Sequence, residues 1–488
     1  MAEFIVAIEL GSSKITGIAG RKNLDGSIKI LAVVKEDSTQ CIRNGVVYNI
    51  DRTCQCLTNI VNKLKNLLKT NIAHVYVGVG GQSIRSVKNV IVKDLSTDTI
   101  ITKDMIDELM DGNRNMTYPD QEILDAVTQE YKVDAQLQID PIGIPATRLE
   151  GNFLNILWRK NFYRNLNKCF DNAGIAIAEM YLAPLALADS VLSEAEKLGG
   201  CVLIDLGADT TTVSVYYKNI LRHLAVIPLG GANITRDIAS LQMEESEAER
   251  MKLKYASAFT EGKDIDDTLR YPIDKDREVV ARQFIEIVEA RVEEIVENAW
   301  FQVPSEYADK LLGGIVLTGG GANMKNIDRA FRNHTRVEKI RIAKFVTQTV
   351  DSTDQTINAK NGTMNTVLGL LAKGNMNCAG PEIDSSLGLF SDPVGTTTGS
   401  TVENHQKPRK PGEITGTGVV LTEAEKNALE EEKRKKEMEA EAERKRQEEE
   451  AEAERKRQED KKKNSFSHKF FRGVKDFFNK MTEPDDAD

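Results

Sequence analysis

The sequence contains one short pattern twice, and this repetition limits the folds that the chain can adopt. Residues 6–11, Val-Ala-Ile-Glu-Leu-Gly, return 196 positions later as residues 202–207, Val-Leu-Ile-Asp-Leu-Gly. Each copy predicts an apolar strand, a carboxylate, a glycine turn and a second strand. A further strand follows each copy, over 30–34 and 223–227. We therefore expect two similar halves, each directing a tight hairpin towards a common space.

Length and composition fit several globular domains. A chain of 488 residues can form two or more domains, and its 40% hydrophobic content permits full cores. Helices are expected over 51–70, 161–173 and 276–300; their alternation with strands predicts an α/β fold.

A net charge of -10 argues against nucleic acid as a partner. Six cysteines without paired spacing argue against a metal site or a disulfide framework and fit a reducing compartment.

No part of the sequence reads as a signal peptide or as a membrane span. The chain enters an apolar strand at Phe4 without a preceding basic region. No stretch approaches the roughly 20 apolar residues that cross a bilayer. If the protein meets a membrane, we expect it to lie on the surface.

The first hairpin turn carries residues suited to phosphate. Gly11 allows a tight turn, and the turn N–H groups can hold an anion. Ser12 and Ser13 add hydroxyl donors, and Lys14 adds a compact positive charge. A glycine hairpin is more often only a hairpin, so this turn alone is a weak indication.

The second copy strengthens the hypothesis. Asp205 ends an apolar strand, where a carboxylate can hold a water bound to Mg²⁺. Gly207, Thr210 and Thr211 again suit a turn that faces phosphate. Two such hairpins across a cleft would hold a polyphosphate from both sides.

A third glycine-rich segment supplies a further wall. The apolar strand 314–318 runs into Gly319, Gly320 and Gly321 and then into a helix start. Glycine lets a flat base or ribose pack against the backbone, and a helix N-terminus favours phosphate. A lone glycine triplet is often only a loop, but this one follows the second hairpin copy.

Together these motifs resemble a known superfamily. Glu-x-Gly-x-x-Lys at 9–14, Asp-x-Gly-x-x-Thr-Thr at 205–211 and Thr-Gly-Gly-Gly at 318–321 are similar to the motifs of the actin/Hsp70/sugar-kinase ATPases. More narrowly, the chain resembles the FtsA family of bacterial actin-like cell-division proteins. The resemblance rests on Glu9 in place of the usual Asp, on 221–239 and 248–252, and on the basic, Phe-rich C-terminus.

The resemblance implies an actin-like two-lobed fold with duplicated sheet-and-helix halves, an inserted subdomain, and a flexible tail ending in an amphipathic helix. It implies ATP and Mg²⁺ in the cleft, polymerisation, and binding of the C-terminal tail of the tubulin-like protein FtsZ to the outer subdomain of the second half. Asp205 would position a metal-bound water. The implied nucleotide contacts are Glu9, Gly11, Ser12, Ser13, Lys14, Gly207, Ala208, Thr210, Thr211, Gly231, Glu249, Lys252, Gly319, Gly320 and Gly321.

The second turn departs from the family pattern. Members usually have Gly-Gly after Asp-x-Gly, but this chain has Ala208 and Asp209, and Thr212 stands where Asp is frequent. A carboxylate beside phosphates repels them unless it points away or reaches the metal. We therefore expect nucleotide binding with, at most, slow hydrolysis.

Residues 464–481 predict an amphipathic helix, with phenylalanines on one face and basic residues on the other. Such a helix lies in an anionic membrane surface, where each basic residue contributes about 1 kcal/mol. The alternative is a helix packed on the globular part. The predicted membrane contacts are Phe466, Lys469, Phe470, Phe471, Arg472, Val474, Lys475, Phe477 and Phe478.

We divide the chain accordingly. The first half is 1–81 with 159–198, the family-specific insert is 82–158, the second half is 199–243 with 304–380, and its outer subdomain is 244–303. A flexible linker (381–422) and a charged, helical or disordered spacer (423–463) precede the terminal helix.

The favoured hypothesis is a structural protein that tethers the FtsZ ring to the cytoplasmic face of the inner membrane at the division site, with itself and other division proteins as partners. The alternatives are a sugar- or acetate-type kinase of the same superfamily and a pilus-assembly actin-like protein.

Overall fold

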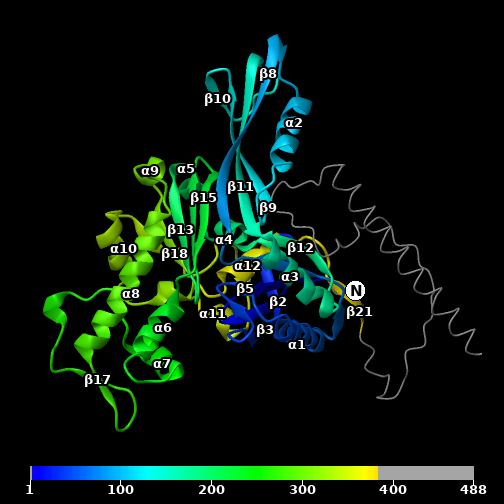
Figure 1. The fold of residues 1–488 in the computed structure, drawn as a ribbon. Coiled ribbons are helices and arrows are strands. Elements are labelled where there is room, and N and C mark those ends of the chain that lie inside the picture. Colours follow the sequence, from blue (N-terminus) through cyan, green and yellow to red (C-terminus); the bar gives the residue numbers. More distant parts are fainter. Residues whose placement is uncertain (1–2, 383–488) are drawn as a thin grey trace, which may run out of the picture. The chain divides into compact units, whose positions relative to one another are not determined.

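The computed structural model describes residues 3–382, whose core is built from two large sheets (Figure 1). The first sheet has six strands, in the spatial order β12 (Ile177–Leu182), β7 (Val75–Val79), β1 (Ile5–Leu10), β2 (Lys14–Lys22), β3 (Ile28–Asp37) and β20 (Val350–Asp351). Strand β1 pairs antiparallel with β2 and parallel with β7.

The second sheet has nine strands and includes those of the insert. Its order is β10 (Gln136–Gln138), β9 (Gln121–Val133), β11 (Pro145–Arg159), β8 (Arg85–Ile100), β15 (Ile220–Ile227), β14 (Thr211–Tyr217), β13 (Cys201–Leu206), β18 (Gly314–Thr318) and β19 (Ile340–Ile342). The insert therefore joins the sheet of the second half, where Ala225 of β15 pairs with Arg85 of β8.

The two halves repeat the same strand register. Glu9 pairs with Thr16 in the first hairpin, and Asp205 pairs with Thr212 in the second. Each first strand also has a parallel neighbour that ends in glycines: β7 beside β1 and β18 beside β13. The predicted duplication of strand and turn is confirmed, and it extends to this parallel strand.

Helices cover both sheets. In the first half and the insert these are α1 (Ile50–Leu68), α2 (Lys103–Arg114), α3 (Lys160–Asn172), α4 (Ala183–Val191) and α5 (Glu194–Gly199). In the rest they are α6 (Gly231–Ala239), α7 (Glu245–Tyr255), α8 (Ala281–Phe301), α9 (Ser305–Ala308), α10 (Ile327–Thr335), α11 (Gln355–Asn358) and α12 (Asn365–Lys373), with short 3₁₀ turns at Gly262–Asp264 and Gly320–Asn323. Three short strand pairs complete the fold: β4 (Ile42–Arg43) with β5 (Val46–Val47), β16 (Arg270–Pro272) with β17 (Glu278–Val280), and β6 (Thr70–Ile72) with β21 (Ala379–Glu382).

Helix α1 shows how the local sequence sets an element. The side chain of Asn49 accepts a hydrogen bond from the N–H of Arg52 and caps the helix start. Leu57, Ile60 and Leu64 recur at helical spacing and are fully buried, and the helix expected over 51–70 is confirmed. The helix ends at Leu68, and the C-cap residue Lys69 has a φ of 54°.

Helix α8 begins later than predicted. The expected range was 276–300, but Glu278–Val280 form β17, which pairs with β16, and the helix starts at Ala281. The apolar period read from the sequence belongs to the helix from Phe284 onwards. An apolar pair at 279–280 fits a strand equally well, because so short a run carries no period.

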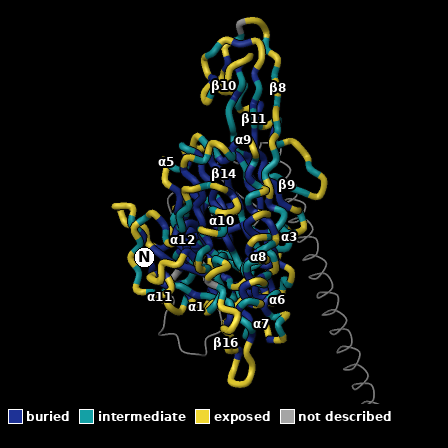
Figure 2. The backbone as a smooth tube through the Cα atoms, turned by 90° about the vertical axis from the view of Figure 1, so that its left-hand side faces the viewer, coloured by how far each residue is buried: buried dark blue, intermediate teal, exposed yellow. Residues whose placement is uncertain are grey.

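Within residues 3–382 the buried residues, drawn in dark blue in Figure 2, form three cores. The largest core surrounds the first sheet and reaches strands of the second half. The second lies between the second sheet and helices α6, α8 and α10, and Phe284 and Phe331 are fully buried in it. The third is small and lies within the insert, where Leu109 of α2 meets Leu149 and Phe153 of β11.

The end of the described chain returns to the first half, which corrects the predicted boundary. Residues 304–380 were assigned wholly to the second half, yet β20 pairs with β3 and α12 packs against β1 and β2. Residues 381–382, expected to begin the linker, end strand β21, which pairs with β6. These pairings join segments far apart in the sequence, so local patterns could not reveal them.

None of the helices within residues 3–382 is long and apolar enough to cross a membrane. The remainder of the predicted linker, the charged spacer and the terminal amphipathic helix lie outside the described residues.

Candidate nucleotide-binding cleft

A cleft of about 1710 Å³ lies between the two halves, and the predicted nucleotide-binding residues other than Thr211 converge on it. Both glycine turns, the glycine triplet after β18 and residues of α6 and α7 form its walls. The predicted residues that line it are Glu9, Gly11, Ser12, Ser13, Lys14, Asp205, Gly207, Ala208, Thr210, Gly231, Glu249, Lys252, Gly319, Gly320 and Gly321.

The two turns have the same hydrogen-bond geometry. Gly11 donates its N–H to the carbonyl of Lys14 at 3.1 Å, and Gly207 donates to the carbonyl of Thr210 at 2.9 Å. A β-carbon at either glycine would lie 2.8 Å from that carbonyl oxygen. Any other residue would therefore open the turn, so the sequence requirement for glycine is steric at both positions.

Thr211 is the exception among the predicted residues. Its place in the second hairpin corresponds to Ile15 in the first, and both side chains are buried. Its hydroxyl donates to the carbonyl of Leu229 at 2.9 Å, inside the protein. Side chains alternate along a strand, so the next residue, Thr212, lines the cleft instead.

Glu9 and Asp205 place two carboxylates in the wall of the cleft. Burial, reinforced by the charge of Asp205, raises the pKa of Glu9 to about 7, although Lys14 and Lys35 oppose the rise. Burial raises the pKa of Asp205 to about 6. Two enclosed carboxylates that repel each other are stabilised by a cation, and oxygen donors suit a hard ion such as Mg²⁺.

Another wall of the cleft is a polar cluster from α6 and α7. The ammonium group of Lys252 donates to the carbonyl of Gly231 at 2.9 Å and to the hydroxyl of Thr235 at 2.8 Å, and it lies 2.6 Å from a carboxylate oxygen of Glu249. Thr235 also donates to Glu249 at 2.5 Å. The cluster holds the ammonium group of Lys252, the hydroxyl of Thr235 and the carboxylate of Glu249 beside the turns. Such groups can bind the hydroxyls of a ribose or the oxygens of a phosphate.

The glycine triplet approaches Asp205 closely. Gly319 has a φ of 85°, and a β-carbon there would lie 2.3 Å from Oδ1 of Asp205. Behind it, the buried amide of Asn365 donates to the hydroxyl of Thr318 and to the carbonyl of Ala343, at 3.0 and 2.8 Å. The backbone at this wall is therefore held close to the carboxylate.

The hairpin tip between β4 and β5 also lines the cleft, and the sequence reasoning missed it. Asn44 and Gly45 have φ values of 50° and 72°, and Gly45 donates its N–H to the hydroxyl of Ser12 at 2.8 Å. A β-carbon on Gly45 would lie 2.5 Å from Cα of Gly81. An Asn-Gly pair is a strong hairpin signal, and Asn44-Gly45 could have identified this turn.

Asp209, the departure from the family pattern, points to this same tip. Its Oδ2 accepts a hydrogen bond from the backbone N–H of Asn44 at 3.0 Å. The carboxylate therefore has a partner across the cleft.

The duplicated halves around one shared cleft define an actin-like, two-lobed α/β protein. Among solved structures, the PilM–PilN type IV pilus biogenesis complex has a similar fold, with a TM-score of 0.52 at 14% sequence identity. The match covers 75% of this chain and 97% of that one.

Sequence comparisons identify the family within this class. The family model "Cell division protein FtsA" matches residues 202–369, and the model "SHS2 domain inserted in FTSA" matches residues 81–157. The cell division protein FtsA of Porphyromonas gingivalis is 31% identical over 403 residues, which are 81% of this chain and 83% of that protein. FtsA of Neisseria meningitidis serogroup B is 33% identical over 332 residues, 66% of this chain and 80% of that protein. The chain belongs to the FtsA family of cell-division proteins.

Proposed function

We propose that this cell-division protein binds ATP with Mg²⁺ in the cleft, polymerises, and tethers FtsZ to the cytoplasmic face of the inner membrane through the amphipathic helix predicted over 464–481. The observation that carries the nucleotide part is the convergence of two matched glycine turns on one cleft. Their N–H groups and Lys14 would hold the phosphates, while Glu9 and Asp205 would hold the metal and its waters. The Lys252 cluster would contact the nucleoside.

Titration with a fluorescent ATP analogue, with and without Mg²⁺, tests the nucleotide site. Lys252→Ala removes the ammonium group of the cluster and should weaken binding by about tenfold, as expected for a charge-assisted hydrogen bond. Lys263→Ala is the matched control, because this lysine lies in the same outer subdomain with its side chain 76% exposed. Equal affinity of Lys252→Ala and the control would refute the assigned role of this cluster.

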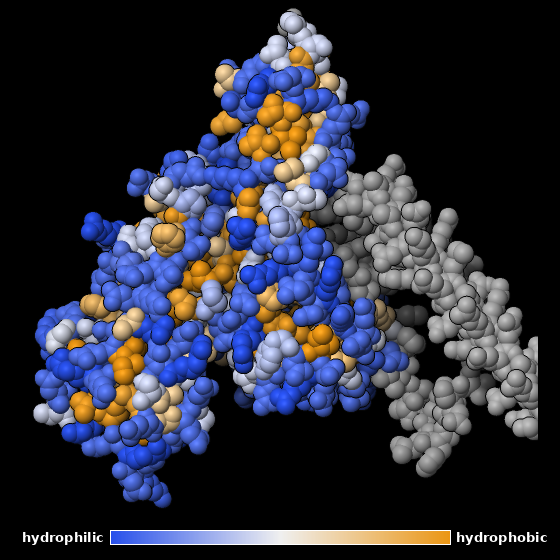
Figure 3. Space-filling view, viewed as in Figure 1, coloured by the Kyte–Doolittle hydropathy of each residue, from blue (hydrophilic) through white to orange (hydrophobic). Residues whose placement is uncertain are grey.

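The described surface supports self-association of the insert. Valines and isoleucines are exposed on its strands and loops, and Figure 3 shows apolar surface on this part of the molecule. Leu137 and Ile139 have exposures of 63% and 76%. Exposed apolar groups that gather in one region mark interaction sites more often than isolated ones do.

Membrane and FtsZ binding rest on the sequence and the family. Sedimentation with anionic liposomes should pellet the full chain and leave residues 1–463 in solution, because the shorter chain lacks the Phe- and Lys-rich segment. A labelled FtsZ tail peptide should bind both chains, since the proposed peptide site is 244–303. Equal pelleting of the two chains would reject the anchor, and absence of peptide binding would reject the tether.

A further inference from the structure

Asp209 and Asn44 connect the two halves across the cleft. Asp209 belongs to the second glycine turn, at the position that Ser13 occupies in the first. Asn44 belongs to the β4–β5 tip of the first half, 165 residues earlier, and donates its N–H to Oδ2 of Asp209 at 3.0 Å. Both residues line the cleft.

The β4–β5 tip binds both turns through neighbouring backbone donors. The N–H of Asn44 contacts Asp209, and the N–H of Gly45 contacts the hydroxyl of Ser12 at 2.8 Å. Successive N–H groups in a turn form a concavity that suits an anion. The tip itself is held in place by Gln82. The backbone N–H of Gln82 donates to the carbonyl of Asn44 at 2.8 Å, and the side-chain oxygen of Gln82 accepts from the side-chain amide of Asn44 at 3.2 Å.

We propose that Asp209 is an internal competitor of the nucleotide phosphates: its carboxylate binds the Asn44 N–H in the ligand-free protein, bridges the two halves, and lowers the affinity for the more highly charged nucleotide. The proposal rests on the proposed nucleotide site and deepens it. The turn donors and Lys14 attract phosphate, whereas the carboxylate on the same turn repels it. Repulsion grows with ligand charge, so Asp209 lowers the preference for ATP over ADP.

Two substitutions separate the effect of the negative charge of Asp209 from that of its hydrogen bond with Asn44. Asp209→Asn keeps an oxygen that can accept from Asn44 and removes the charge. Asp209→Ala removes both. The matched control is Glu245→Gln, which neutralises a carboxylate that lines the same cleft at the first residue of α7.

Titration of the full chain with fluorescent ATP and ADP analogues in Mg²⁺ measures the competition. Asp209→Asn should bind ATP about tenfold more tightly than the wild type, the effect of removing one like charge at several ångströms in a wet cleft. ADP should gain less, and Glu245→Gln should leave the ATP-to-ADP ratio unchanged. An ATP affinity for Asp209→Asn that is equal to or weaker than that of the wild type would overturn the proposal.

Amide hydrogen exchange of the ligand-free chain tests the bridge without nucleotide. The amides of residues 42–47 should exchange about fivefold faster in Asp209→Ala than in the wild type, because the Asn44 N–H loses its acceptor. In Asp209→Asn they should exchange at close to the wild-type rate. Unchanged exchange in Asp209→Ala would show that no bridge exists. If the wild type bound no nucleotide at all, the proposed nucleotide function would fail, and the exchange result would still decide whether the bridge forms.

Discussion

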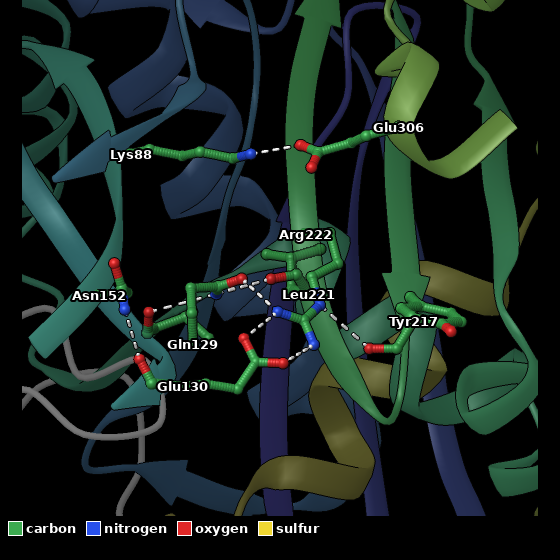
Figure 4. A network of polar contacts seen from close by, with 9 residues as sticks. Lys88, Gln129, Glu130, Asn152, Tyr217, Leu221, Arg222 and Glu306 are labelled. Atoms are coloured by element: carbon green, nitrogen blue, oxygen red, sulfur yellow. Dashed lines mark hydrogen bonds and ion pairs between the residues drawn. The ribbon is translucent and has the colours of Figure 1, made fainter. Parts of the chain in front are cut away.

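Arg222 of β15 and Glu130 of β9 form a two-pronged ion pair that joins the insert to the second half (Figure 4). Both nitrogen–oxygen distances are 2.7 Å, and the Arg222 side chain is only 5% exposed. Arg222 also donates to the carbonyl of Tyr217, and Gln129 donates to the carbonyl of Leu221 at 2.9 Å. Hydrogen bonds from Arg222 hold the pKa of Glu130 below its usual value.

Breaking this pair should be costly, because the charge that remains is largely removed from water and has lost its partner. Arg222→Ala leaves Glu130 without its partner and should lower the free energy of unfolding by about 3–5 kcal/mol. Adding Glu130→Gln to Arg222→Ala should recover part of that loss. The measurement is urea unfolding of both single variants and the double variant.

The control for this cycle is the second ion pair in Figure 4, Lys88 with Glu306. Its side chains are 58% and 50% exposed, so Lys88→Ala should change the free energy of unfolding by at most about 1 kcal/mol. Comparable losses for Arg222→Ala and Lys88→Ala would contradict the structural role assigned to the buried pair.

Helix α8 offers a stability test with its own control. Phe284 is fully buried and meets the ring of Tyr271 edge-on, with centroids 5.5 Å apart, and Tyr271 in turn stacks on Tyr255 at 4.3 Å. Phe284→Ala should lower the free energy of unfolding by about 3–5 kcal/mol through lost contacts and a residual cavity. Phe301, on the same helix, is 85% exposed, so the free energy of unfolding of Phe301→Ala should stay within about 0.5 kcal/mol of the wild type. Thermal unfolding of both variants measures the two changes. Similar losses for both would mean that α8 packs in a different register.

The raised pKa of Glu9 makes stability depend on pH when no nucleotide is bound. The folded protein holds the Glu9 proton up to a pKa of about 7, while the unfolded chain releases it near 4.5. Stability from this group is therefore present in full below pH 4.5 and is lost as pH rises to 7. Glu9→Gln cannot ionise at this position. Its midpoint of thermal unfolding, relative to that of the wild type, should therefore increase as pH rises from 5 to 7.5.

The compared quantity is the difference between wild type and Glu9→Gln, because other groups titrate in the same range. Burial lowers the pKa of His74, which contributes stability that is present above its ordinary pKa and lost as pH falls. A difference in midpoint that stays constant between pH 5 and 7.5 would show that Glu9 is not shielded from water in the folded protein.

Gly319 and Gly143 share a φ of 85° and differ in their surroundings. A β-carbon at Gly143 meets nothing within 4 Å. Gly143→Ala should therefore lower the free energy of unfolding only by the strain of a positive φ, about 1 kcal/mol. Gly319→Ala adds a clash with Asp205 and should also weaken binding of a fluorescent ATP analogue. The thermal midpoint and the affinity are measured for both variants. Intact nucleotide binding in Gly319→Ala would argue against this wall of the site.

Most of the cleft could be predicted because its residues occur in short motifs. The strand, carboxylate and glycine turn at Glu9 and at Asp205 are contiguous, and glycine in such a turn is required by local sterics. Thr211 was misassigned because a turn motif does not specify which of two adjacent threonines faces the cleft. The strand pairing decides this, since Thr211 takes the buried position of Ile15.

The sequence by itself determined the duplicated halves, the glycine turns and the family, because each depends on residues adjacent in the chain or on periodic patterns. Only the tertiary structure decided three long-range relationships. The insert joins the second sheet through β8 and β15, β20 and α12 return to the first half, and Asp209 meets Asn44 across the cleft. Each depends on which surfaces pack together, and packing is settled by the burial and hydrogen bonding of the whole fold.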